Sequence, residues 1–107
     1  MGKQITPNEA AKLCNNFDSK YSNLCDFIGK DDNRSVLFSL QEMKSYIDYL
    51  ENQNGEINGI RVYLGSYDDT NLTTVFLAPT INGADDTTLE VLNVGETGNP
   101  PKSKYKI

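Results

Sequence analysis

The chain lacks histidine and tryptophan altogether, and its 107 residues include only two cysteines. Histidine is the usual general base near neutral pH and the commonest metal ligand. Its absence excludes the Ser/His/Asp and Cys/His catalytic arrangements. Two cysteines without histidine also cannot complete the four ligands of a structural zinc site. We therefore expect no metal, no cofactor and no catalytic residue, and an enzyme is the less favoured class.

Long apolar runs are missing as well. The longest, Val75 to Ala78, has four residues, whereas a membrane-spanning helix needs about 20. The first residues, MGKQITPNEAAKL, contain neither the apolar run nor the cleavage site of a secretory signal. The sequence therefore predicts a cytoplasmic protein with no membrane partner.

Positive charge is scarce, with 10 basic against 15 acidic residues and a net charge of −5. Phosphate binding needs a clustered positive field, so we expect no nucleic-acid partner. Three of the positive charges, Lys102, Lys104 and Lys106, lie within the last eight residues. This basic tail has two interpretations, a solvated chain end or an electrostatic hook for an acidic partner.

What the chain does contain is enough for one core. Hydrophobic residues make up 37% of it, and six tyrosines and four phenylalanines supply large apolar groups. A length near 100 residues is the usual size of one domain. We expect a single domain over residues 1–92, followed by a Gly/Pro-containing basic tail over 93–107.

The first predicted element is one long helix over residues 7–28. Thr6 and Glu9 have the spacing of a capping box, Pro7 takes the first helical position, and Gly29 can end the helix in a left-handed conformation. Weak helix formers allow a kink near Ser22 and Asn23. The helix carries an apolar stripe suited to a core, which consists of Ala10, Leu13, Cys14, Phe17, Tyr21, Leu24, Cys25 and Ile28.

The two cysteines lie on this stripe. On a continuous helix, Cys14 and Cys25 are separated by about 16 Å along the axis, which no disulfide bridges. The spacing predicts two free core thiols in a reducing compartment. A redox pair that closes across a broken helix is the alternative.

A short strand over residues 35–38 then feeds a second helix. Ser39 and Glu42 repeat the capping-box spacing, and Asn54-Gly55 end the helix. Its apolar face consists of Leu40, Met43, Tyr46, Ile47 and Leu50.

The remaining pattern predicts a β-sheet. Apolar residues alternate from Gly59 to Gly65, a turn-rich loop follows over 66–71, and a return strand over 72–78 is stopped by Pro79. After a polar turn over 82–86 we expect a last strand over 87–92. The order α-β-α-β-β-β predicts a two-layer α+β fold. Both helices are expected on one face of a small, mainly antiparallel sheet, the face of Ile60, Val62 and Leu64.

Four segments in this order also carry a resemblance: SVLFSLQEMKSYIDYLE, GIRVYLGSY, TTVFLAPT and the NVGETGNPP tail. Together they resemble a group of small, uncharacterised bacterial proteins over roughly residues 35–101. The resemblance implies a natural unit and not a fragment of an enzyme. It implies no activity, cofactor or partner.

Other motifs are weak. Three acidic doublets, at residues 31–32, 68–69 and 85–86, lie in predicted loops, where aspartate is common. None has the spacing of a calcium loop, so we interpret them as solvated turns, with a hard-cation site as the alternative. The glycines form neither of the phosphate-binding patterns, so no nucleotide site is expected.

The most informative residue is Arg61, which lies mid-strand beside Tyr63 on the face opposite the predicted helices. The hairpin places Phe76 nearby, and Tyr67 lies in the adjoining loop. Arginine, tyrosine and phenylalanine are enriched at protein interfaces. The plainer interpretation is an arginine packed over a solvated sheet face and paired with Glu90.

These residues lead to one functional hypothesis and one alternative. The hypothesis is a non-enzymatic protein-interaction module that binds through the open sheet face around Arg61, Tyr63, Tyr67 and Phe76, with a homodimer as one form. The alternative is a small-molecule or anion-binding protein, or a small enzyme, in which Arg61 clamps the ligand and Tyr63 or Tyr67 donates a hydroxyl group.

Overall fold

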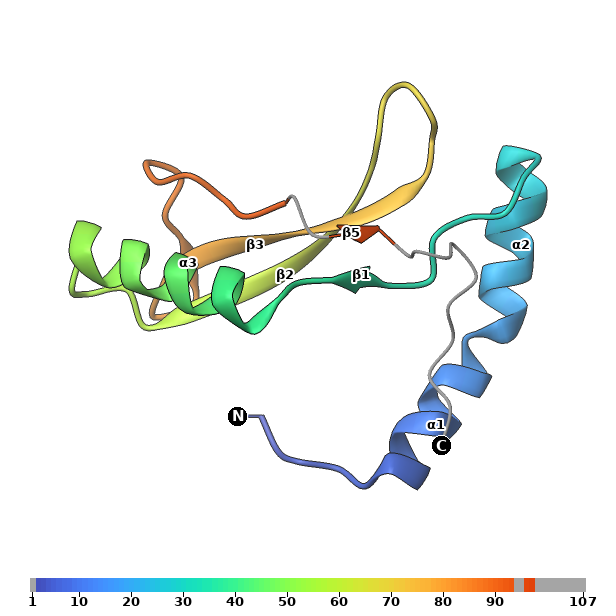
Figure 1. The fold of residues 1–107 in the computed structure, drawn as a ribbon, viewed down its shortest axis with the longest axis horizontal. Coiled ribbons are helices and arrows are strands. Elements are labelled where there is room, and N and C mark those ends of the chain that lie inside the picture. The colour runs from blue at the N-terminus through green and yellow to red at the C-terminus, as the bar shows by residue number, and fades with distance from the viewer. Residues whose placement is uncertain (1, 94–95, 98–107) are drawn as a thin grey trace.

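The computed structural model of this chain describes residues 2–93 and 96–97 (Figure 1). The helices are α1 (Pro7–Asn16), α2 (Asp18–Ile28) and α3 (Leu40–Gln53). The strands are β1 (Val36–Leu37), β2 (Gly59–Ser66), β3 (Thr73–Ile81), β4 (Ala84–Asp85) and β5 (Glu96–Thr97). The α+β class predicted from the sequence is confirmed.

The main sheet has the strand order β2-β3-β4 and is antiparallel throughout. β2 and β3 pair without a bulge, from Gly59 opposite Thr80 to Ser66 opposite Thr73. Gly59 suits this register because a Cβ atom there would come within 2.4 Å of the Thr80 Oγ1 atom. The predicted hairpin is therefore present, with β3 as the central strand.

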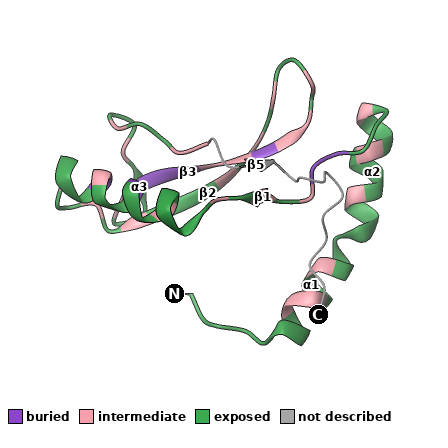
Figure 2. Ribbon diagram, in the orientation of Figure 1, coloured by how far each residue is buried: buried purple, intermediate pink, exposed green. Residues whose placement is uncertain are grey.

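One core joins the helix layer to the sheet layer. Tyr46 and Leu50 of α3 pack against Leu77 of β3. Around these three lie the half-buried residues Phe38, Met43, Tyr49, Ile57, Leu89 and Leu92. The Tyr46 hydroxyl also donates to the Leu77 and Glu90 carbonyls, at 3.1 and 2.9 Å, so α3 holds both β3 and the chain that follows β4. Figure 2 shows that burial is concentrated in β3 and in the loop after α2.

The prediction of one continuous helix over 7–28 is wrong, because the chain breaks at Phe17. The capping box of Thr6 and Glu9 is present, but α1 ends at Asn16 and α2 begins at Asp18. Asn15 and Asn16 are weak helix formers, and they supply too little propensity to carry the helix through. No residue of α1 or α2 is fully buried. The two helices lie at the end of the sheet opposite to α3 (Figure 1).

The end of the sheet differs from the prediction too. β3 continues through Pro79 to Ile81, and Pro79 is fully buried. This is tolerated because Pro79 needs no N–H for β2, and its carbonyl accepts from Asp86 N at 2.9 Å on the other side. Asn82 and Gly83, with φ of 50° and 86°, form a tight turn into β4.

No strand covers 87–92, so the predicted last strand is wrong, apart from one bridge between Leu92 and Leu77. Conversely, the segment NVGETGNPP was assigned to the tail that follows the domain, yet it contributes β5, which pairs with β1. Lys102, Lys104 and Lys106 lie outside the described residues. Within residues 2–93 and 96–97, no helix has both the length and the apolar character needed to cross a membrane.

Candidate functional site

Three of the four predicted binding residues meet on one face of the β2–β3 hairpin. Tyr63 lies opposite Phe76 in the register, and their rings stack with centroids 5.1 Å apart. Arg61, two residues before Tyr63 on β2, lies on the same face of the hairpin. It donates to Asp85 Oδ1 at 3.0 Å and to the Gly83 carbonyl at 2.9 Å. The hydroxyl group of Tyr63 donates to the other carboxylate oxygen of Asp85.

Asp85 is thus the residue that sequence reasoning missed at this cluster. Glu90 was the expected partner of Arg61, but the ion pair is made with Asp85. The signal that could have found it was Asn82-Gly83, a strong hairpin dipeptide, which would have put Asp85 on a strand beside β3. Tyr63 first, and then the Asp85 carboxylate, raise the pKa of Arg61 above its ordinary value.

Tyr67 lies four residues after Tyr63, directly after the end of β2 at Ser66. Its hydroxyl oxygen accepts from Thr74 Oγ1 at 3.2 Å, and its backbone N–H donates to the Leu72 carbonyl. It serves to close the hairpin loop, and no contact joins it to Arg61. The polar face is therefore a cluster of Arg61, Tyr63, Phe76 and Asp85, with Tyr67 beside it.

The charge of this cluster bears on the anion-clamp alternative. Asp85 offsets the positive charge of Arg61 and occupies its guanidinium with a direct hydrogen bond. An anionic ligand would have to displace Asp85 before it could bind Arg61. The geometry therefore gives no support to an anion clamp at this position.

The opposite face of β2 gives a different result from the one expected. Ile60, Val62 and Leu64 were predicted to face the helix layer, but Val62 is 61% and Leu64 80% exposed. The reason is the position of α3, which packs on Leu77 of β3 and reaches β2 only near Ile60. We call Ile60, Val62 and Leu64 the β2 stripe.

The outer edge of β2 is exposed along with the stripe. Leu77 exchanges both of its backbone hydrogen bonds with Leu92, at 2.8 and 3.1 Å, on the side of β3 away from β2. Because Leu77 lies opposite Val62, the N–H and C=O groups of Val62 point away from β3. The same orientation recurs at every second residue, so Ile60 and Leu64 share it. Among the residues that the structure describes, no strand pairs with this edge.

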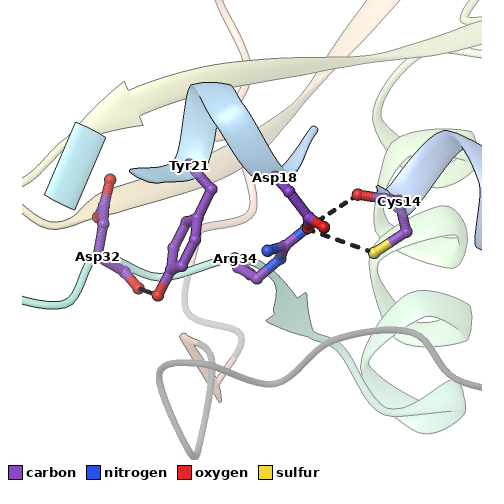
Figure 3. Close-up of polar contacts among 5 residues, drawn as sticks. All are labelled: Cys14, Asp18, Tyr21, Asp32 and Arg34. Carbon is purple, nitrogen blue, oxygen red and sulfur yellow. Dashed lines mark hydrogen bonds and ion pairs between the residues drawn. The ribbon is translucent and has the colours of Figure 1, made fainter. Parts of the chain in front are cut away.

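A second polar cluster holds α1 and α2 together at their break (Figure 3). The Arg34 side chain is only 7% exposed. Its Nη2 atom donates to the Cys14 carbonyl and to Asp18 Oδ1, both at 2.9 Å, and its guanidinium lies 4.7 Å from the centroid of the Tyr21 ring. Burial lowers the pKa of Arg34, but the hydrogen bonds to Asp18 and Cys14 outweigh this effect and raise it. Arg34 therefore donates a hydrogen bond to a carbonyl group in the last turn of α1. Its guanidinium group is charged at all ordinary pH values.

The loop after α2 is fixed to β3 by a buried carboxylate. Asp32 is 1% exposed, and its Oδ1 atom accepts from Thr73 N at 2.7 Å and from Asn33 N at 2.8 Å. Its Oδ2 atom accepts from Thr73 Oγ1 at 2.6 Å. The interpretation of residues 31–32 as a solvated turn is therefore wrong for Asp32. Asp32 is a structural anchor, because its carboxylate accepts hydrogen bonds from Asn33 and Thr73.

The two cysteines are free thiols, both half-buried. Cys14 Sγ accepts from Arg34 at 3.7 Å, and Cys25 Sγ accepts from Asp32 N at 3.3 Å. Each sulfur thus belongs to a different structural contact. Within the described part of the chain, no group of three potential metal-binding side chains comes together.

Comparison with known proteins adds no family to these observations: no family model, no curated protein and no solved structure matches this chain.

Proposed function

We propose that this chain is a non-enzymatic interaction module that binds a protein partner on the β2 stripe and the adjoining outer edge of β2. The observation that carries the proposal is the exposure of Val62 and Leu64, at 61% and 80%, on a strand whose outer edge pairs with no other strand of the described residues. Unpaired edges with apolar side chains are templates for pairing with another chain. Backbone groups supply hydrogen bonds to the partner, and alternate side chains supply specificity.

The proposal moves the binding surface from the Arg61 face to the opposite face of the same strand. On the Arg61 face, polar groups are already paired with one another, through Asp85 and Gly83. On the stripe, by contrast, burial of apolar surface supplies a driving force of about 25 cal/mol per Å². The free thiols of Cys14 and Cys25 support a reducing compartment, so we place this interaction in the cytoplasm.

Selection from a displayed library of random peptides tests this function. We expect peptides with alternating apolar residues to bind the wild-type protein. Val62→Lys should weaken that binding at least ten-fold, because it places a charge in the interface. Leu13→Lys is the matched control, since Leu13 of α1 is also 61% exposed, and it should leave binding unchanged.

Arg61→Ala separates the two faces of β2. We expect it to leave peptide binding and folding nearly unchanged, because an exposed ion pair contributes little to stability. If Arg61→Ala abolishes binding while Val62→Lys does not, the partner binds the Arg61 face and the proposal is wrong. If no peptide binds better to the wild type than to Val62→Lys, the surface is not a peptide-binding surface.

A further inference from the structure

We infer that the partner on the outer edge of β2 is a second copy of this chain, paired antiparallel about a two-fold axis at Val62. This inference rests on the proposed function and names the occupant of that surface. Figure 1 shows β2 at the margin of the sheet, with β3 on its other side. Two such margins placed together would join two three-stranded sheets into one.

The backbone of β2 fits this register. Ile60, Val62 and Leu64 present their N–H and C=O groups to the outer edge, as the pairing of Leu77 with Leu92 requires. With the axis at Val62, each of the three faces another outward residue: Val62 faces Val62, and Ile60 faces Leu64 in both directions. Every one of these pairs can exchange two backbone hydrogen bonds. The one-to-one register of β2 with β3 means that no bulge turns the edge away.

The side chains favour the same register. On one face, the β2 stripes of the two copies form three apolar cross-strand pairs. On the other face, Arg61 of each copy lies opposite Tyr63 of the other copy, so that no two like charges are directly opposed. An axis at Arg61 would instead place two like charges directly opposite each other, which is destabilising. The axis at Val62 is the one that pairs all three members of the stripe with each other.

Charge also favours a second copy over a charged partner. The whole chain carries −5, but Arg61 is the only charged residue of β2, and Asp85 offsets it. β2 is therefore locally neutral, and two copies can pair along it without repulsion between acidic residues of this strand. Lysine and proline, which commonly protect edge strands from pairing, are both absent from β2.

Sedimentation over a range of concentrations tests the dimer. We expect the wild-type protein to pass from monomer to dimer, and Val62→Lys to raise the dissociation constant at least ten-fold. Leu13→Lys, with the same exposed fraction, should behave as the wild type. Urea unfolding of each variant shows whether the fold is kept. A wild type that stays monomeric at all concentrations, or a dimer that Val62→Lys leaves unchanged, overturns the inference.

Disulfide trapping tests the register and does not depend on how well Val62→Lys folds. In a hydrogen-bonded antiparallel pair the Cα atoms lie about 5.5 Å apart, which is within disulfide range. Val62→Cys should therefore link to itself under mild oxidation. Ile60→Cys should not, because the two copies of residue 60 are offset by about 14 Å along the strand. It should link instead to Leu64→Cys when the two variants are mixed.

Mass spectrometry of the digested proteins locates each link and separates it from links through Cys14 or Cys25. A Val62→Cys protein without the link between the two copies of residue 62 overturns the register. Failure of the dimer is distinguishable from failure of the proposed function. A monomeric protein whose selected peptides still require Val62 refutes the second copy as partner and keeps the interaction surface.

Discussion

β2 and β3 have similar apolar sequences but opposite surroundings. In β2 the apolar residues Val62 and Leu64 are mostly exposed, whereas in β3 Leu77 is 4% exposed and Ala78 is 6% exposed. β3 has β2 on one side, β4 and Leu92 on the other, and α3 across one face. β2 has β3 alone. Alternation of apolar residues thus establishes which side chains share a face, but the number of neighbours decides whether that face is buried.

The difference also separates two roles of apolar surface. On β3 it stabilises the fold, together with Tyr46 and Leu50. On β2 it contributes little to the isolated chain and is available to a partner. A protein can keep such an exposed strand only if the cost to solubility is offset, and the net charge of −5 on the whole chain serves that end.

The largest effect should come from removing the side chain that is buried on β3. Leu77→Ala creates a cavity between β3 and α3, so we expect the free energy of unfolding to fall by about 2–5 kcal/mol. Val62→Ala, on the same face of the sheet, should change it by only about 0.5 kcal/mol, as surface substitutions do. Urea unfolding of the two variants at low protein concentration measures both values. Equal losses would show that β2 is buried as well, and the comparison would fail.

The next effect concerns the anchor at the start of β3. Asp32→Ala leaves Thr73 N and Thr73 Oγ1 without their acceptor. Because Asp32 is buried, we expect a loss of about 1–3 kcal/mol in the free energy of unfolding. Asp68→Ala, an exposed residue of the β2–β3 loop, is the control and should change little. A loss at Asp68 as large as the loss at Asp32 would contradict the role of Asp32 as an anchor.

Much of this architecture could be predicted because its signals are local. The capping boxes at Thr6 and Ser39 set the starts of α1 and α3. Alternation located β2, and the turn-rich loop that follows it located β3 as the return strand of a hairpin. The weak helix formers Asn15 and Asn16 favour a break but do not fix its position. The contact that stabilises the break at Phe17 could not be predicted, because the Arg34 guanidinium reaches the Cys14 carbonyl 20 residues earlier in the chain. A polar turn over 82–86 was predicted, but the strand β4 at Ala84–Asp85, within that range, was missed because the last strand was expected over 87–92.

The candidate site was predictable only in part. Pairing across the hairpin correctly placed Tyr63 beside Phe76, since a regular hairpin fixes which residues are opposite each other. The partner of Arg61 and the exposure of Val62 depended on where β4 and α3 pack, and the periodicity of one strand does not contain that information. The binding roles of Arg61, Tyr63, Tyr67 and Phe76 stay predictions.

A smaller effect is expected at Tyr21, which joins α2 to the same anchor. Its hydroxyl donates to the Asp32 carbonyl at 2.8 Å, so Tyr21→Phe should cost about 1 kcal/mol at neutral pH. Burial first, and then the Cys25 thiol, raise the pKa of Tyr21 from 10.0 to about 12. The folded state therefore holds this proton more tightly than the unfolded state does, and its contribution is complete below pH 10 and lost as the pH rises through 12.

Urea unfolding of the wild type and Tyr21→Phe between pH 7 and pH 12 measures this effect. The stability advantage of the wild type should shrink above pH 10, and any effect that is common to both proteins cancels in the difference. An advantage that stays constant to pH 12 would contradict the raised pKa.

The smallest effect should come from truncation after Asn93, which tests how far the support of β3 extends along the chain. The truncated protein keeps Leu92, with both of its bonds to Leu77. It also keeps the Asn93 side chain, whose Nδ2 atom donates to the Val75 carbonyl at 2.9 Å and to Thr74 Oγ1 at 3.2 Å. What it loses among the described residues is β5, two residues that pair with β1 and not with β3.

We therefore expect the free energy of unfolding to fall by less than about 1 kcal/mol, with the cooperative transition retained. A truncation that abolishes the transition would mean that residues after Asn93 support the core, and β3 would then depend on more of the chain than α3, β2 and Leu92.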